Sequence, residues 1–299
     1  IKKVLYDFFT FGGRFFWEDV INYQNWVIQR NIRTQKYRLL DNHNIRRDSG
    51  SFEECKNTLL KYIEACELES PYNDSIILLH NYGRTKFSWN RISESLSGIK
   101  ANIIAVNYAS LHKSLVHHAN LLESFLKNLN TPASGKLYFV THGAGCLVLR
   151  KFLAQIENYR IYNIAQVLDI NPINSGSDLA DLLRNSAFLR KILGPMLLDM
   201  TPKKALDTPK LPHDIPHGII FYPPAYTQLL KKLLSRYESF PLLTPPSESS
   251  YAENICNIQR HYFWPLTDSE LGKTCFKYLT SGEFESKAAT PTEAANSDK

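Results

Sequence analysis

From Pro71 onward the sequence alternates between short apolar runs and amphipathic segments, and this alternation restricts the fold more than any other feature. Buried strands that are joined by helices form a parallel sheet with helices on both faces. We therefore predict an α/β fold. The predicted strands are 75–80, 102–108, 136–141, 164–170, 217–222 and 261–266, with helices near 89–96, 111–129 and 147–157 and a last one near 270–279.

The first 70 residues differ in texture, and we expect them to form a segment that packs on a core spanning 71–284. The aromatic stretch 1–28 has a glycine pair in its middle, which predicts a helix that breaks there and resumes at Arg14 or Phe15. Packing against the domain body is the favoured role of these aromatic side chains, and a membrane surface or a protein partner is the alternative.

Residues 31–50 predict two short strands and a turn. Ser51 and Glu54 then have the spacing of a capping box, which predicts an amphipathic helix that ends near Leu68. Within the core, 176–215 is expected to form a lid-like insertion, and the tail 285–299 has the composition of a disordered segment.

Composition excludes some classes of function. The net charge is +6, but the basic residues are scattered rather than gathered into a stripe, so no nucleic-acid partner is expected. The five cysteines show no disulfide or CxxC spacing, which favours a reducing compartment and hence the cytoplasm. His213 and His217 have no third ligand nearby, so we predict neither a metal nor a cofactor.

The segment FVTHGAGC, at the end of a predicted strand, has the shape of a nucleophile elbow. That motif, G-x-S-x-G, places a serine in a tight strand-to-helix turn. In this chain Thr141 takes the place of the first glycine, Gly143 that of the serine and Gly145 that of the second glycine.

Five segments together resemble a family of bacterial lipase- and esterase-like α/β hydrolases: LLHNYGRT, VTHGAGCLVLR, NPINSGSDLADLLR, LRKILGPM and HYFWPLTDSEL. Members of that family carry an HGLGRT loop, a THSLGG elbow, a PPNQGSELAD segment and a PVTHTFM segment with the catalytic histidine. The opening FTFGGRFFWED and the SFEEC helix are also similar, so the resemblance covers nearly the whole chain. It implies an α/β-hydrolase fold with a mostly parallel central sheet.

The departures from the family pattern fall on the catalytic positions. Gly143 has no side chain that can attack a carbonyl, and Asp268 stands where the resemblance places the histidine base. A carboxylate is a much weaker base than imidazole at neutral pH. The acid position falls on Ser247 or Glu248, so at least two of the three roles are missing and we expect a pseudoenzyme.

The backbone part of the site is retained. The resemblance places the oxyanion hole at the amides of Tyr82 and Ala144, and a substituted side chain does not remove an amide. With His142 beside the turn and Arg84 in the preceding loop, these residues predict a pocket that binds an acyl or other amphipathic small molecule. Surface binding of a protein partner, or of a membrane through 1–28, is the alternative use.

An active ester hydrolase with relocated residues is the competing hypothesis. Cys146 or a loop serine (Ser88, Ser175 or Ser177) would then be the nucleophile, with His142 or His261 as the base. We favour the interpretation that Cys146 is a small buried core residue and that the serines stabilise turns or cap helices.

Overall fold

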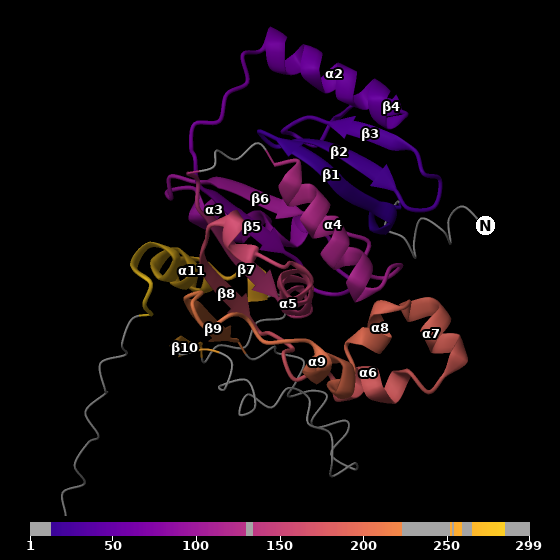
Figure 1. The fold of residues 1–299 in the computed structure, drawn as a ribbon, viewed down its shortest axis with the longest axis vertical. Helices are drawn as coiled ribbons and strands as arrows, with labels where there is room; N and C mark the ends of the chain where they lie inside the picture. The colour runs from indigo at the N-terminus through magenta and orange to yellow at the C-terminus, as the bar shows by residue number, and fades with distance from the viewer. Residues whose placement is uncertain (1–12, 130–133, 223–251, 253, 259–264, 285–299) are drawn as a thin grey trace, which may run out of the picture.

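The computed structural model describes residues 13–129, 134–222, 252, 254–258 and 265–284, which form two sheets with helices around them (Figure 1). The larger sheet has six parallel strands in the order β10-β9-β8-β7-β5-β6. These strands are β5 (Ser75–Leu79), β6 (Asn102–Val106), β7 (Leu137–His142), β8 (Ile164–Ile170), β9 (His217–Phe221) and β10 (Asn254–Asn257).

Helices cover both faces of this sheet. Successive side chains of a strand point to opposite faces, so Ile77 and Leu79 of β5 join the core under α4 (Leu115–Lys127) and α5 (Gly145–Gln155). Ile76 and Leu78 join the core under α3 (Asn90–Leu96) and α11 (Ser269–Ser281). This arrangement confirms the predicted parallel sheet with helices on both faces.

The strand order reverses around β5, because β6 lies on one side of it and β7 on the other. The loop after β5 leads to α3, and the turn after β7 leads to α5 on the opposite face. Such a switch point opens a crevice beyond the carboxyl ends of the two strands, where ligands of α/β sheets bind. Residues 80–85 and 142–145 follow the carboxyl ends of these two strands and therefore form the candidate site.

The predicted strand at 261–266 is not found where the structure describes the chain. Residues 261–264 lie outside the described residues, and Pro265–Thr267 form a 3-10 helix. The sixth strand is β10, whose short NICN run lacks the aromatic residues that favoured the later segment.

The N-terminal sheet is an antiparallel meander of β1 (Trp17–Tyr23), β2 (Trp26–Asn31), β3 (Tyr37–Leu40) and β4 (Arg46–Gly50). The helix α2 (Phe52–Ala65) packs on it, as Figure 1 shows. Both bonds of the predicted capping box are present between Ser51 and Glu54. The two strands predicted within 31–50 are β3 and β4.

The helix predicted to resume at Arg14 or Phe15 is wrong beyond a single short turn. Within the described part of this segment, residues 13–28, only Arg14–Phe16 are helical, as a 3-10 turn, and β1 and β2 follow. Gln24 and Asn25 have φ of 52° and 63°, which is the left-handed geometry of a two-residue hairpin turn. Phe16 and Trp26 are buried, so these two aromatic side chains pack inside the protein, whereas Phe15, Trp17 and Tyr23 are partly exposed. Residues 1–12 lie outside the described residues.

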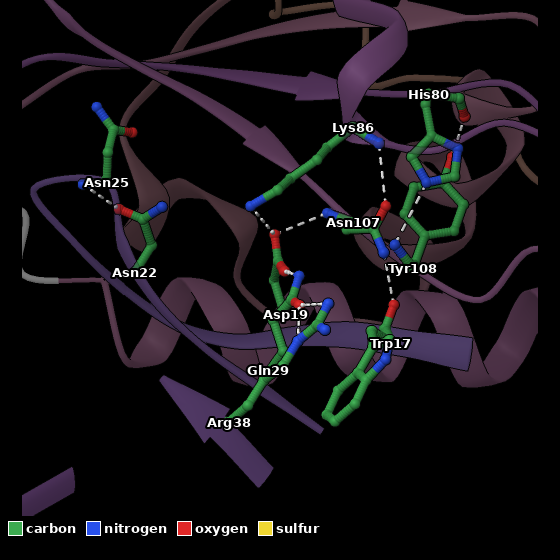
Figure 2. A network of polar contacts seen from close by, with 10 residues as sticks. All are labelled: Trp17, Asp19, Asn22, Asn25, Gln29, Arg38, His80, Lys86, Asn107 and Tyr108. Carbon is green, nitrogen blue, oxygen red and sulfur yellow. Dashed lines mark hydrogen bonds and ion pairs between the residues drawn. The ribbon is translucent and has the colours of Figure 1, made fainter. Parts of the chain in front are cut away.

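A buried polar network docks the N-terminal sheet onto the core (Figure 2). Asn107, which follows β6, accepts at its carbonyl from the Asp19 amide at 2.9 Å, and its own amide donates to Asp19 Oδ2 at 2.9 Å. Its side chain donates to the Trp17 carbonyl at 2.5 Å and accepts from the Lys86 amide at 3.0 Å. Asp19 is fully buried and also accepts from Gln29 at 2.5 Å. Polar groups that are paired in this way fix the position of the docked sheet.

The insertion consists of four short helices: α6 (Asp178–Leu183), α7 (Ala187–Leu193), α8 (Met196–Asp199) and α9 (Pro202–Asp207). Its two ends meet at Arg150 of α5, whose side chain is 2% exposed. The guanidinium donates to Asn174 on one side and to the carbonyls of Ala205, Thr208 and Pro209 on the other.

The part of the chain that the structure describes contains no helix with the length and apolar character of a membrane span.

Candidate functional site

The turn after β7 has the strand-turn-helix shape that the sequence predicts. β7 ends at His142, Gly143 has φ +53°, and α5 begins at Gly145. A positive φ favours glycine, because a β-carbon crowds the backbone there. Gly143 is buried, and its amide donates to the Ile170 carbonyl of the neighbouring β8 at 3.0 Å. The turn is thus held by the sheet itself.

The loop after β5 brings Asn81 against this turn. The side-chain oxygen of Asn81 accepts from the Ala144 amide at 2.9 Å and from the Tyr82 amide at 2.8 Å. These are the two amides that the resemblance places together, and both donate to this one oxygen.

The same side chain fills the space next to Gly143. A β-carbon built on Gly143 would lie 2.3 Å from the Oδ1 atom of Asn81 and 2.5 Å from its Nδ2. Contacts this short do not occur between real side chains, so any larger residue at 143 requires Asn81 to move. The Asn81 side chain therefore occupies space that is available only because residue 143 is a glycine.

The backbone of Asn81 is held independently of its side chain. Its carbonyl accepts from the Arg84 amide at 3.1 Å and lies 2.9 Å from Nδ1 of His80. Nε2 of His80 accepts from the Tyr108 amide at 3.3 Å, which leaves the proton on Nδ1 to donate to Asn81. The rings of His80 and Tyr108 stack at 3.9 Å, as Figure 2 shows. Burial lowers the pKa of His80 to about 4, so the ring is neutral at pH 7.

His142 lies beside the turn but is poorly suited to act as a base. Its ring makes an edge contact with Trp89 at 6.3 Å, and its buried Nδ1 has no hydrogen-bond partner among the residues that the structure describes. Burial, followed by the charges of Arg84 and His80, lowers the pKa of His142 to about 3. A ring with so low a pKa accepts a proton only weakly at neutral pH. Arg84 itself is exposed in the loop.

Asp268 has a structural role in the helix that follows it. It is the N-cap of α11, and its Oδ1 accepts from the Glu270 amide at 3.1 Å. Its Oδ2 accepts from the Tyr222 hydroxyl at 2.5 Å, and the residue is buried. Both carboxylate oxygens are thus occupied. The residues predicted at the acid position, Ser247 and Glu248, lie outside the described residues, as does His261.

The residues proposed as relocated nucleophiles have other surroundings. Cys146 is buried in the core under α4 and α5, whereas His142 contacts Trp89 of the core on the opposite face. Ser177 is the N-cap of α6, and the Ser88 hydroxyl donates to the Thr85 carbonyl at 2.9 Å. The described ranges hold no group of three histidine, cysteine or acidic side chains that could bind a metal.

Asn81 is the residue that sequence reasoning missed. It stands where the resembling family has the second residue, a glycine, of its HGLGRT loop. Asparagine side chains often accept hydrogen bonds from nearby backbone amides, and this one binds an amide directly after it in the chain. A polar residue in place of that glycine was the available signal.

No family model matches the chain, and no curated protein matches it. Among solved structures, the mature form of the Bacillus licheniformis lipase BlEst2 is similar, with a TM-score of 0.52 and 15% identity over 70% of this chain and 92% of that one. The propeptide form of BlEst2 has a TM-score of 0.52 and 14% identity, over 74% of this chain and 52% of that one. The chain therefore spans about half of the propeptide form. Together with the parallel sheet, this similarity shows that the chain has an α/β-hydrolase fold.

Proposed function

We propose that this chain is a lipase-like pseudoenzyme that binds an acyl or other amphipathic ligand without hydrolysing it. The observation that carries the proposal is Gly143, which occupies the serine's place in the turn after β7 and whose missing side chain is replaced in space by Asn81. Without a hydroxyl or thiol at this point, no acyl-enzyme bond can form.

The surroundings of Asp268 support the loss of the base. Its carboxyl group caps α11 and accepts from the Tyr222 hydroxyl, so both oxygens already serve the fold. Of the pairs that the competing hypothesis of an active ester hydrolase offers, Cys146 with His142 is disfavoured, because the two residues belong to opposite faces of the sheet.

The insertion supports an amphipathic ligand. Phe188 and Ile192 of α7 are 72% and 54% exposed, and their spacing of four residues places them on one side of the helix. Arg190 and Lys191 lie in the last turn of the same helix. Exposed apolar side chains next to positive charges suit a molecule with an acyl chain and an anionic head.

Hydrolysis is tested with p-nitrophenyl acetate, butyrate and octanoate, together with a fluorophosphonate label. We expect no turnover above that of buffer and no labelling. Turnover that is lost on mutation of Cys146, Ser88, Ser175 or Ser177 would instead establish the relocated hydrolase.

Binding is tested by fluorescence titration with 11-(dansylamino)undecanoic acid. We expect saturable binding that weakens several-fold in the double variant Phe188→Ser, Ile192→Ser, because the acyl chain loses its apolar contacts. The matched control is Ile45→Ser, Leu60→Ser. It removes two apolar side chains that are 53% and 52% exposed, one between β3 and β4 and one on α2. No saturation with the wild-type protein, or equal weakening in both double variants, would refute an acyl ligand at the insertion.

A further inference from the structure

We propose that Asn81 is an internal ligand of the anion-binding position of this fold, so that the Tyr82 and Ala144 amides accept an external carboxylate only when the Asn81 side chain is removed or rotates away. The inference rests on the proposed function, since it treats the crevice as a site for binding. It adds that an external carboxylate is excluded from the two amides while the Asn81 side chain is bonded to them.

The first step is the geometry of the two amides. They belong to different loops, yet both donate to one oxygen at 2.8 and 2.9 Å, which are ordinary lengths for such bonds. This is the arrangement with which hydrolases of this fold stabilise a negatively charged substrate oxygen. Because each amide has one proton, an external acceptor must displace Asn81 to bind both.

The second step is the preference of the position for charge. The Ala144 amide lies at the amino end of α5, a helix of 11 residues, where the helix dipole favours anions. A carboxylate accepts hydrogen bonds more strongly than a neutral amide oxygen. Asn81 therefore holds the position because it is covalently placed beside it, and a carboxylate is the better acceptor once the side chain is gone.

The third step is that the loop does not depend on the side chain. The Asn81 carbonyl is held by Arg84 and His80, and the Gly83 amide donates to the Ser110 hydroxyl at 3.1 Å. Residue 81 is half-buried, so its side chain borders solvent. We therefore expect Asn81→Ala to leave both amides in place and unoccupied.

The test is a titration with sodium acetate at constant ionic strength, followed through the amide ¹H–¹⁵N resonances of Tyr82 and Ala144. Acetate has no acyl chain to contact the insertion, so the result does not depend on whether an acyl ligand binds or an ester is hydrolysed. In Asn81→Ala we expect both resonances to shift saturably, with an apparent Kd at least about tenfold lower than in the wild-type protein. Asn81→Asp, which keeps an acceptor in place, should not respond.

The control is Asn73→Ala, an exposed asparagine before β5, which should behave as the wild-type protein does. Equal titration of wild-type and Asn81→Ala proteins would show that the side chain excludes nothing. No response in a folded Asn81→Ala variant would show that the amides form no anion site. If that variant does not fold, deuterium exchange of the wild-type protein decides: protected Tyr82 and Ala144 amides, unaffected by acetate, support the proposal, and rapid exchange overturns it.

Discussion

A β-carbon on Gly143 would lie 2.3 Å from Cγ of Asn81, although the two residues belong to different loops. The side chain of Asn81 is fixed by two backbone amides, so it cannot yield without the loss of both bonds. Positions 81 and 143 are therefore coupled, and a substitution at one changes the cost of a substitution at the other.

The coupling can be measured as a free energy of unfolding. We expect Gly143→Ala to lower it by about 1–3 kcal/mol, because alanine is strained at φ +53° and also meets Asn81. In an Asn81→Ala background the same change should cost less, since only the backbone strain remains. Urea denaturation of the two single variants and the double variant gives the cycle; additive costs would contradict the coupling.

Restoring the catalytic residue types should not restore catalysis while Asn81 remains. We expect Gly143→Ser alone, and Gly143→Ser with Asp268→His, to give no turnover of p-nitrophenyl acetate above buffer. The reason is that a serine β-carbon would lie 2.3 Å from Cγ of Asn81, so the displaced Asn81 side chain and the serine would compete for the space beside the two amides. Steady-state turnover by either variant with Asn81 intact would show that the side chain leaves the position readily.

Asp268 should matter for stability. Asp268→Ala removes the N-cap of α11 and leaves the Tyr222 hydroxyl without its buried acceptor. We expect the free energy of unfolding to fall by about 1–3 kcal/mol in urea denaturation. Ser269→Ala, at the next and exposed position, is the control and should be nearly neutral. Similar values for the two variants would argue that Asp268 has no structural role.

Acid should destabilise the protein through its buried histidines. Burial lowers the pKa of His80 to about 4 and that of His118 to about 3; His118 faces Glu18, His117, His80 and Tyr108. Both rings stay neutral in the folded state while the unfolded chain takes up protons below pH 6.5. The free energy of unfolding therefore falls as the pH drops through 6.5 and continues to fall toward the folded values, by up to about 1.4 kcal/mol per pH unit for each ring.

His118 allows this effect to be isolated, because its ring is almost fully buried and packs against Tyr108. Urea denaturation at pH 7 and pH 5 should show a loss on acidification that is smaller by about 2 kcal/mol in His118→Leu than in the wild-type protein. His213→Leu, at an exposed position before β9, serves as the control. An unchanged loss in His118→Leu would mean that the ring is protonated in the folded protein.

The docking of the N-terminal sheet should depend on Asn107. Asn107→Ala removes the bonds that its side chain makes to the Trp17 carbonyl and the Lys86 amide. Hydrogen exchange read by mass spectrometry should show faster exchange in β1 and β2, with the centre of the large sheet unchanged. Asn31→Ala, whose side chain caps an exposed turn, is the control. Equal protection in all three proteins would show that the network does not hold the sheet.

The sequence predicted five strands of the large sheet, β5 to β9, because buried parallel strands are continuous apolar runs that can be recognised locally, but it missed β10. The aromatic segment was harder. Trp17, Tyr23 and Trp26 are spaced so that a helix and a hairpin fit equally, and the turn at Gln24 and Asn25 decided between them. Neither residue is the glycine that marks such turns most clearly.

The candidate site was predictable only in part. The resemblance located Gly143, Ala144 and Tyr82, and the structure brings these amides together. The role of Asn81 depends on the approach of two loops that are 63 residues apart, which no local pattern encodes. Asp268 illustrates the same limit, because its partner Tyr222 lies 46 residues earlier in the chain.

The guanidinium of Arg150 gathers the carbonyl of Asn174 and those of Ala205, Thr208 and Pro209 at one point beneath the insertion. The segment from α6 to α8 thus leaves and rejoins the body through a single clamped stem. Its sequence and length can change without altering the register of the sheet. We therefore expect substitutions between these two ends to act on the insertion alone and to leave the sheet below it unaltered.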